Sequence, residues 1–299
     1  MKRQSSIIEL PADFRRDDFL AYHRRDALMI AENVSKDLLR KGITWNNCPA
    51  CLTIRLKARH AESELAADGS PSMPGCDECG QMAWRMLGLK QKIEDFEEQY
   101  AAHPHLGRLI AQQPGLRVPL AATPFEALTW AIIGQQISVN AAVSVRRNFI
   151  RVAGVRHSSG MWCYPDAERV SRLTVADLRS AGFTLGKARA VIALSQRIVE
   201  KQLILHEIED GETADDIRAS LMKISGIGPW TVNYALLRGF GWLDGSLHGD
   251  VAVRRGIQAL LDTPGKITEE QARSWLADFS PWRALVAAHL WATQTRKVY

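Results

Sequence analysis

The stretch that decides the fold covers residues 221–257 and reads LMKISGIGPWTVNYALLRGFGWLDGSLHGDVAVRRGI. It predicts a helix that contains Leu221, a tight turn with the sequence SGIG, and a second helix that begins near Trp230. Glycine at such a turn allows positive φ and lets another backbone come close. The free N–H groups at the start of the second helix form an anion site with the helix dipole. A duplex backbone can bind there through phosphate; the alternative is a plain helical corner in which the glycines only reverse the chain.

The chain after about residue 107 carries one helix signal after another. Threonines precede the apolar-periodic segments and are N-cap candidates; they are Thr123, Thr174, Thr184, Thr213 and Thr268. The first of these segments runs to about Val152, and Ser280-Pro281 is expected to start the last helix. Asp216 and Gln271 stand at capping-box positions after the threonines at 213 and 268. Residues 107–299 are therefore predicted to be an all-helical domain.

Residues 1–106 have a more mixed pattern. DFRRDDFLAYHRRDAL at 13–28 suggests a short helix, and CLTIRLKARH at 51–60 alternates apolar and polar residues as a half-buried strand does. MAWRMLGLKQKIEDFEEQYAAH at 82–103 begins apolar and continues as a polar helix. This region is predicted to be an α+β domain.

Composition sets the broad class. The chain has 299 residues, of which 46% are hydrophobic and 24% charged, and a net charge of +5. This profile excludes a disordered chain and leans slightly towards polyanionic partners. No apolar run approaches the roughly 20 residues of a membrane span, and the N-terminus does not resemble a secretory signal. A cytoplasmic protein with no membrane partner is expected.

Four of the five cysteines form two CxxC pairs, Cys48/Cys51 and Cys76/Cys79. Two thiolate pairs that close a tetrahedral site are typical of structural zinc. The alternative is four reduced thiols that lie near one another. We expect one structural zinc ion without a catalytic role, because four cysteine ligands leave no open coordination position. Cys163 stands alone and is expected to be buried.

Residues 221–257 resemble the helix-hairpin-helix and the following catalytic Asp of the DNA glycosylase superfamily. The chain is most similar to the 3-methyladenine DNA glycosylase II family. Three further segments agree in order and spacing: PFEALTWAIIGQQISVNAA at 124–142, GFTLGKARAVIALS at 182–195 and SPWRALVAAHLWAT at 280–293. The resemblance covers about residues 107–299 and implies two helical lobes around a cleft. The zinc pattern in the N-terminal region departs from the family.

The resemblance also implies roles for single residues. Asp250 takes the place of the essential carboxylate, although without the resemblance a solvated or helix-capping Asp would be the better interpretation. The residues expected to line the base pocket are Trp230, Tyr234, Trp282 and Tyr22; each could instead be a core aromatic. The residues expected to contact DNA are Gln136, Gly226, Gly228, Thr231 and Arg254, with Gln136 inserted into the gap that an extruded nucleotide leaves. The carbonyls expected to hold a sodium or potassium ion are those of Met222, Ile224 and Gly226.

The implied reaction fits these residue types. A base must leave the stack before its glycosidic bond is cut, and a carboxylate stabilises the positive charge that then develops on the sugar. Alkylation at purine N3 or N7 makes the base a cation, which gains about 0.5–2 kcal/mol on a Trp or Tyr face. Superfamily members that also cut the strand carry a Lys two residues after the second hairpin glycine, where this chain has Trp230, which cannot form a Schiff base.

The sequence therefore predicts a monofunctional DNA glycosylase that hydrolyses the N-glycosidic bond of alkylated purines (3-methyladenine, 7-methylguanine) in duplex DNA and starts base-excision repair. Two alternatives stay open. One is a glycosylase for another lesion, such as uracil, hypoxanthine or a mismatched base. The other is a non-catalytic DNA-binding protein. We expect a monomer that uses no organic cofactor and associates with the nucleoid through DNA.

Overall fold

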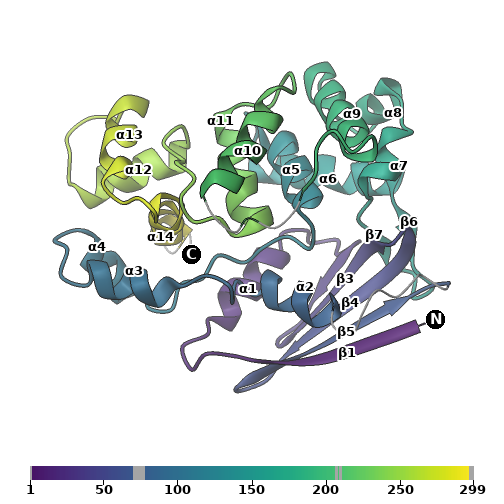
Figure 1. Ribbon diagram of the computed structural model, residues 1–299, viewed down its shortest axis with the longest axis horizontal. Coiled ribbons are helices and arrows are strands. Elements are labelled where there is room, and N and C mark those ends of the chain that lie inside the picture. The colour runs from purple at the N-terminus through teal and green to yellow at the C-terminus, as the bar shows by residue number, and fades with distance from the viewer. Residues whose placement is uncertain (1, 70–77, 206–207, 209–210, 296–299) are drawn as a thin grey trace.

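The computed structural model describes residues 2–69, 78–205, 208 and 211–295. In this part of the chain, an antiparallel sheet lies beside two groups of helices (Figure 1). The sheet has five strands in the order β1-β5-β4-β3-β2. They are β1 (Lys2–Glu9), β2 (Glu32–Val34), β3 (Leu38–Trp45), β4 (Cys48–Leu56) and β5 (His60–Ala67). The α+β character predicted for the N-terminal region is confirmed.

Two helices, α1 (Arg16–His23) and α2 (Glu78–Met86), pack on one face of this sheet. Alternate residues of β4 point to that face, because successive side chains of a strand face opposite sides. Leu52 is fully buried there, in one apolar cluster with Phe19 of α1 and Met86 of α2. Burial of each such side chain contributes about 1.5–3 kcal/mol. Helix α1 and the loop after it are therefore held firmly against the sheet.

The later helices form two further apolar cores. The first core is built by α5 (Pro124–Gly134), α6 (Val139–Ala153), α7 (Ala167–Ser171), α8 (Val175–Ser180), α9 (Leu185–Val199), α10 (Gly211–Met222) and α11 (Pro229–Ala235). The second is built by α3 (Ile93–Tyr100), α4 (Leu106–Gln112), α12 (Val251–Leu260), α13 (Glu269–Ala277) and α14 (Arg283–Thr295). A π-helical turn, η1 (Leu236–Phe240), contributes to both cores. Across the described ranges, no helix combines the length and the apolar character needed to cross a membrane.

Helices α3 and α4 pack with the C-terminal helices although they come early in the chain (Figure 1). Phe96 and Tyr100 of α3 share the second core with Leu285 of α14. The boundary predicted between residues 106 and 107 falls at the first residue of α4, after α3 has already joined this core. The helical part of the fold therefore begins near Ile93.

Several predicted helix starts are confirmed. The side chain of Thr123 accepts a hydrogen bond from the Glu126 N–H, and Thr268 and Gln271 form the predicted capping box. The prediction at Thr213 is wrong, because α10 begins two residues earlier, at Gly211.

The segment expected to continue from Thr123 to about Val152 is interrupted. Helix α5 ends at Gly134 and α6 begins at Val139. Gln136, between them, has a φ of 56°, a left-handed conformation that non-glycine residues rarely adopt. The break therefore exposes a short tip between two helices.

A small β-hairpin interrupts the half that was predicted to be all-helical. Its strands are β6 (Val155–Arg156) and β7 (Trp162–Cys163). Beyond the end of β2, Tyr164 pairs with β3 in parallel: its N–H donates to Gly42 O at 2.9 Å, and its carbonyl accepts from Thr44 N. A Cβ on Gly42 would lie 2.0 Å from Trp162 O, so only glycine fits this approach. The helical part is thus joined to the N-terminal sheet by a single bridge residue.

Candidate active site

Asp250 is the N-cap of α12, and its carboxylate is held from several directions. Oδ1 accepts hydrogen bonds from the backbone N–H groups of Ala252 (2.8 Å) and Val253 (3.1 Å) and from the indole N–H of Trp291 (3.3 Å). Oδ2 accepts from the indole N–H of Trp230 (2.9 Å). A carboxylate offers about four lone-pair sites. Oδ2 therefore keeps a free lone pair, and the half-buried residue is within reach of a ligand.

Aromatic rings extend from this carboxylate towards the sheet. Trp230 stacks on Tyr234 with centroids 5.3 Å apart and an interplanar angle of 29°. Tyr234 also lies 6.2 Å from Trp291, centroid to centroid. The indole N–H of Trp130 donates to the Tyr234 hydroxyl at 3.0 Å. The structure thus brings the predicted pair Trp230 and Tyr234 together with Asp250.

Trp282 does not join this cluster. Its indole N–H donates to Gln99 Oε1 at 3.3 Å, and its ring lies 6.0 Å from Phe96 of α3. Trp291 takes the place expected for Trp282. Both tryptophans lie in the segment quoted from residues 280–293, but Trp282 precedes α14, whereas Trp291 lies within α14 and reaches Asp250. The segment 280–293 was thus correctly expected to supply a tryptophan, but the residue that reaches Asp250 is Trp291 and not Trp282.

Tyr22, at the end of α1, meets the cluster from the sheet side. The guanidinium carbon of Arg25 lies 4.2 Å from the Tyr22 ring centroid, and that of Arg238 lies 4.7 Å from it. Burial alone would raise the pKa of Tyr234, but the charges of Arg25 and Arg238 together hold this pKa below its usual value. Sequence reasoning missed both arginines and Trp130.

A small cavity opens beside these groups. Its lining includes Tyr22, Arg25, Asp26, Glu126, Trp130 and Arg146. Its volume is about 30 Å³, room for one or two water molecules. Asp250 does not line it. Tyr234 connects the two, because it accepts a hydrogen bond from Trp130 and stacks on Trp230.

The predicted hairpin is present between α10 and α11. Gly226 has a φ of 89°, which favours glycine, and Gly228 is the N-cap of α11. The Gln135 amide donates to Gly226 O (2.9 Å) and to the Thr231 hydroxyl (2.8 Å). Thr231 is 2% exposed, so its side chain is not available to DNA as predicted.

The tip between α5 and α6 is tied to both the hairpin and α9. Lys187 Nζ donates to Ile133 O (2.8 Å), near the end of α5, and to O of Gln135 (2.7 Å), the C-cap residue. Gln136 is exposed next to this anchored residue, and Ile137 is 39% exposed. The structure places Gln136 at an exposed tip next to Gln135, which contacts the hairpin, and its insertion into DNA stays a prediction.

Two further predictions concern the carbonyls that would hold an alkali-metal ion and the DNA contact of Arg254. Ile224 O accepts from Ile227 N, and Gly226 O accepts from Gln135. A carbonyl oxygen has two lone pairs, so both can still face a cation, and the alkali-metal site with Met222 O stays a prediction. Arg254 is half-buried, and its Nε has no hydrogen-bond partner among the described residues.

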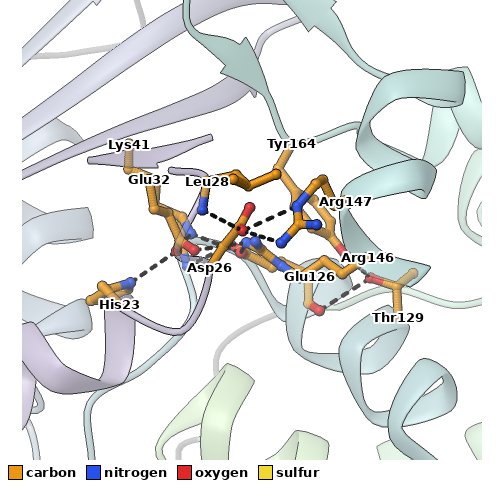
Figure 2. Close-up of polar contacts among 11 residues, drawn as sticks. His23, Asp26, Leu28, Glu32, Lys41, Glu126, Thr129, Arg146, Arg147 and Tyr164 are labelled. Atoms are coloured by element: carbon orange, nitrogen blue, oxygen red, sulfur yellow. Dashed lines mark hydrogen bonds and ion pairs between the residues drawn. The ribbon is translucent and has the colours of Figure 1, made fainter. Parts of the chain in front are cut away.

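A second group of charged side chains lies buried between the sheet and the helices (Figure 2). Lys41 of β3 pairs with Glu32 of β2 and, at 2.7 Å, with Glu126 of α5. Arg146 of α6 approaches both carboxylates, at 3.1 and 2.9 Å. Burial alone would raise the pKa of Glu32, but Arg146 and Lys41 hold it well below its usual value. We call Glu32, Lys41, Glu126 and Arg146 the ion cluster.

The ion cluster anchors the end of α1, which carries Tyr22 and is followed by the loop with Arg25. His23 Nδ1 lies 3.0 Å from Glu32 Oε1. On the other side of Arg25, Asp26 pairs with Arg147 at 2.6 Å (Figure 2). Arg25 thus lies between two residues with buried polar contacts, His23 and Asp26, and Tyr22 directly precedes the first of them.

The described cysteines do not converge. Cys51 faces away from the layer of α2, since it alternates with Leu52, whereas Cys79 is buried in α2, with its Sγ 3.6 Å from Ser63 Oγ. The sheet therefore separates Cys51 from Cys79. Cys76 lies outside the described residues, within which no three His, Cys, Asp or Glu side chains group as metal ligands. This arrangement does not fit one four-cysteine site, and the zinc stays a prediction. Cys163 is buried, as expected.

Known proteins resemble this chain in sequence. DNA-3-methyladenine glycosylase from Bacillus subtilis is 29% identical over 206 residues, which are 68% of this chain and 68% of that protein. DNA-3-methyladenine glycosylase 2 from Escherichia coli is 32% identical over 191 residues, 63% of this chain and 64% of that protein. The chain thus matches about two thirds of the length of each relative.

Solved structures share the fold. A 3-methyladenine DNA glycosylase from Archaeoglobus fulgidus superposes with a TM-score of 0.76 at 20% identity, covering 98% of both chains. An 8-oxoguanine glycosylase/lyase from Clostridium acetobutylicum, in complex with double-stranded DNA, gives 0.74 at 14% identity over 100% of this chain and 97% of that one. The model of the HhH-GPD superfamily of base excision DNA repair proteins matches residues 129–281. Since this match spans half of the chain, the chain belongs to the HhH-GPD superfamily.

Proposed function

We propose that this protein is a monofunctional DNA glycosylase that hydrolyses the N-glycosidic bond of alkylated purines in duplex DNA. The observation that carries the proposal is the carboxylate of Asp250, which keeps one oxygen partly free beside the rings of Trp230, Tyr234 and Trp291. Membership of a base excision repair superfamily and the names of the relatives support the same reaction.

The reaction follows from these groups. The bond between sugar C1′ and the purine nitrogen breaks, and its electron pair leaves with the base. A water oxygen bonds to C1′ and releases a proton to Asp250 or to solvent. Asp250 stabilises the positive charge that develops on the sugar, and it orients the water through Oδ2. Four N–H donors fix the carboxylate in advance, so little reorganisation is needed as the charge forms.

The substrate class follows from the rings. A purine alkylated at N3 or N7 is a cation and already a good leaving group, so it needs little acid catalysis. Electron-rich faces of Trp and Tyr attract such a base. The cluster of Trp230, Tyr234 and Trp291, with Trp130 and Tyr22 beyond it, offers several such faces.

The monofunctional character rests on Trp230. Its indole donates to Asp250 at the position where strand-cutting members of the superfamily carry a lysine. An indole cannot form the Schiff base that strand cleavage through a lyase step requires. The product is therefore an abasic site in an intact strand.

Release assays on matched duplexes test the proposal. Each duplex carries one lesion, which is 7-methylguanine, hypoxanthine, uracil or a mismatched base, and free base and strand breaks are measured separately. We expect fastest release of 7-methylguanine, with strand breaks only after alkali. Preference for a neutral base would overturn the substrate class, and breaks without alkali would overturn the monofunctional assignment. Duplex binding with no release of any base would favour a DNA-binding protein without catalysis.

A further inference from the structure

Arg25 is a half-buried cation held mainly by aromatic residues. Its guanidinium carbon lies 4.2 Å from the Tyr22 ring centroid and 5.3 Å from that of Trp130. Among the described residues, no carboxylate lies within 4 Å of it as an ion pair. Buried charges are usually paired with an opposite charge. The faces of the Tyr22 and Trp130 rings stabilise the Arg25 charge in place of a carboxylate, which is a cation–π arrangement.

The space around Arg25 leaves no room for a base. The adjoining cavity measures about 30 Å³, enough for one or two waters and far less than a purine needs. The guanidinium is planar and delocalised, so it fills the position between Tyr22 and Trp130 much as a flat, cationic ring would. We call this position the Tyr22–Trp130 slot.

Arg238, the neighbouring cation, is fixed in a different way. Its Nη1 donates to Pro119 O at 2.9 Å, while its guanidinium carbon lies 4.7 Å from the Tyr22 ring centroid. For Arg25, no hydrogen bond to a main-chain carbonyl is found within the described ranges. Arg25 and Arg238 both interact with the Tyr234 side chain as well. Because only Arg238 has the main-chain contact, Arg25 can leave the slot while the rings and Arg238 stay in place, and it gives up its contact with Tyr234 when it does.

We propose that Arg25 is a resident stand-in for the substrate base: it fills the Tyr22–Trp130 slot and must withdraw before an alkylated purine can stack there. The inference rests on the proposed function and deepens it. A slot that already holds a planar cation on electron-rich faces suits a cationic base. The cation–π contact of Arg25 is lost each time a base enters, so Arg25 tunes how readily the slot accepts its ligand.

The test compares Arg25→Met with the wild type in single-turnover release of 7-methylguanine. Methionine keeps an apolar chain of similar reach but removes the planar charge. We expect the half-saturating enzyme concentration to fall by about 2- to 30-fold, the fold-change that corresponds to a cation–π contact of about 0.5–2 kcal/mol. The rate at saturation stays within about twofold, because Asp250 and its partners are untouched.

Three comparisons separate this role from a merely structural one. The fall is larger for 7-methylguanine than for hypoxanthine, since only the cationic base is also repelled by a nearby guanidinium. Arg25→Lys, which keeps the charge without the planar group, falls between wild type and Arg25→Met. Arg24→Met, which changes the exposed neighbour, matches the wild type.

The outcomes are distinguishable. If the wild type releases no base, the proposed function fails, and this inference fails with it. If the wild type is active but Arg25→Met has an unchanged half-saturating concentration, the stand-in role alone is overturned. A higher half-saturating concentration or a lower rate at saturation also overturns it and would mean that Arg25 contacts the substrate. Should Arg25→Met not fold, an unchanged half-saturating concentration in Arg25→Lys also overturns it.

Discussion

Glu126 and Asp250 both stand at the start of a helix, yet they are surrounded in opposite ways. Glu126 is 5% exposed, and Lys41 and Arg146 neutralise it. Asp250 is half-buried and accepts hydrogen bonds from neutral N–H groups, with no cation within 4 Å as an ion pair among the described residues. A carboxylate whose charge is already balanced has little to offer a sugar cation. Under the proposed function, Asp250 is the better suited of the two to stabilise a sugar cation, because it has no counter-charge of its own.

Asp250→Asn is the substitution with the largest expected effect on activity. Asn is as good an N-cap as Asp, so the free energy of unfolding changes by only about 1 kcal/mol. Base release falls by about 10²- to 10⁴-fold, because the charge next to the sugar is lost. Single-turnover release and duplex binding measure the two parts. Asp262→Asn, at an exposed site just after α12, is the matched control. Release at the wild-type rate would show that Asp250 only caps its helix.

Glu126→Gln is expected to lower the free energy of unfolding and to leave the release rate nearly unchanged, the reverse of Asp250→Asn. It leaves Lys41 and Arg146 with Glu32 alone, and breaking a buried pair costs about 3–5 kcal/mol. Chemical denaturation measures this loss. The release rate per folded molecule stays near that of the wild type, because Asp250 keeps its partners.

Glu168→Gln is the control for this substitution. Glu168 pairs with Arg172 at the surface, where its side chain is 41% exposed, and such pairs contribute about 0–1 kcal/mol. Equal destabilisation by the two variants would contradict the contrast between the ion cluster and the surface.

The hairpin was predictable because its signals are contiguous in the sequence, and Asp250 was identified because the resemblance extends over the residues that follow the hairpin. The glycine turn, Trp230 and Tyr234 follow one another closely, and one helix register aligns them. The choice between Trp282 and Trp291 depends on how α14 packs against α12, which no local pattern specifies. The sequence therefore predicts that a tryptophan of that segment lies in the site, but it does not specify which tryptophan.

The contact between Arg25 and Trp130, on the sheet side of the site, could not be predicted from the sequence for a different reason. Arg25 and Trp130 meet only after the N-terminal domain docks on the helices. Tyr164 pairs with β3 across a long sequence separation, and Gly42 allows it because a side chain there would clash. This pairing lies between Val152 and Thr174, where no helix signal was identified and where the all-helical prediction was an extension from the neighbouring segments.

His289 is a buried titratable group with no counter-charge, unlike the ion cluster. Neither ring nitrogen has a hydrogen-bond partner in the part of the chain that is described, and burial lowers the pKa of His289 to about 4. The unfolded chain binds the proton at about pH 6.5. The neutral ring therefore stabilises the fold above pH 6.5, and this contribution is lost as the pH falls towards 4.

His289→Leu should flatten the pH dependence of unfolding. Over this interval the wild type is expected to lose about 3 kcal/mol that the variant keeps. Denaturation at pH 7, 5.5 and 4.5 measures it. His60→Gln, at an exposed position, should follow the wild type. A variant as acid-sensitive as the wild type would place the titrating group elsewhere.

Cys51→Ser is expected to have the smallest effect, and it tests whether the sheet domain holds a metal as well as buried charges. Cys51 lies on the opposite face of β4 from the layer that contains Cys79, so the two sulfurs cannot bind the same ion. The zinc content of the purified variant should equal that of the wild type. Elemental analysis of both, with Cys79→Ser beside them, makes the measurement. Zinc at one ion per chain in the wild type and its loss in Cys51→Ser would mean that the two CxxC pairs do close one site, and that β4 and α2 are arranged differently from the structure described.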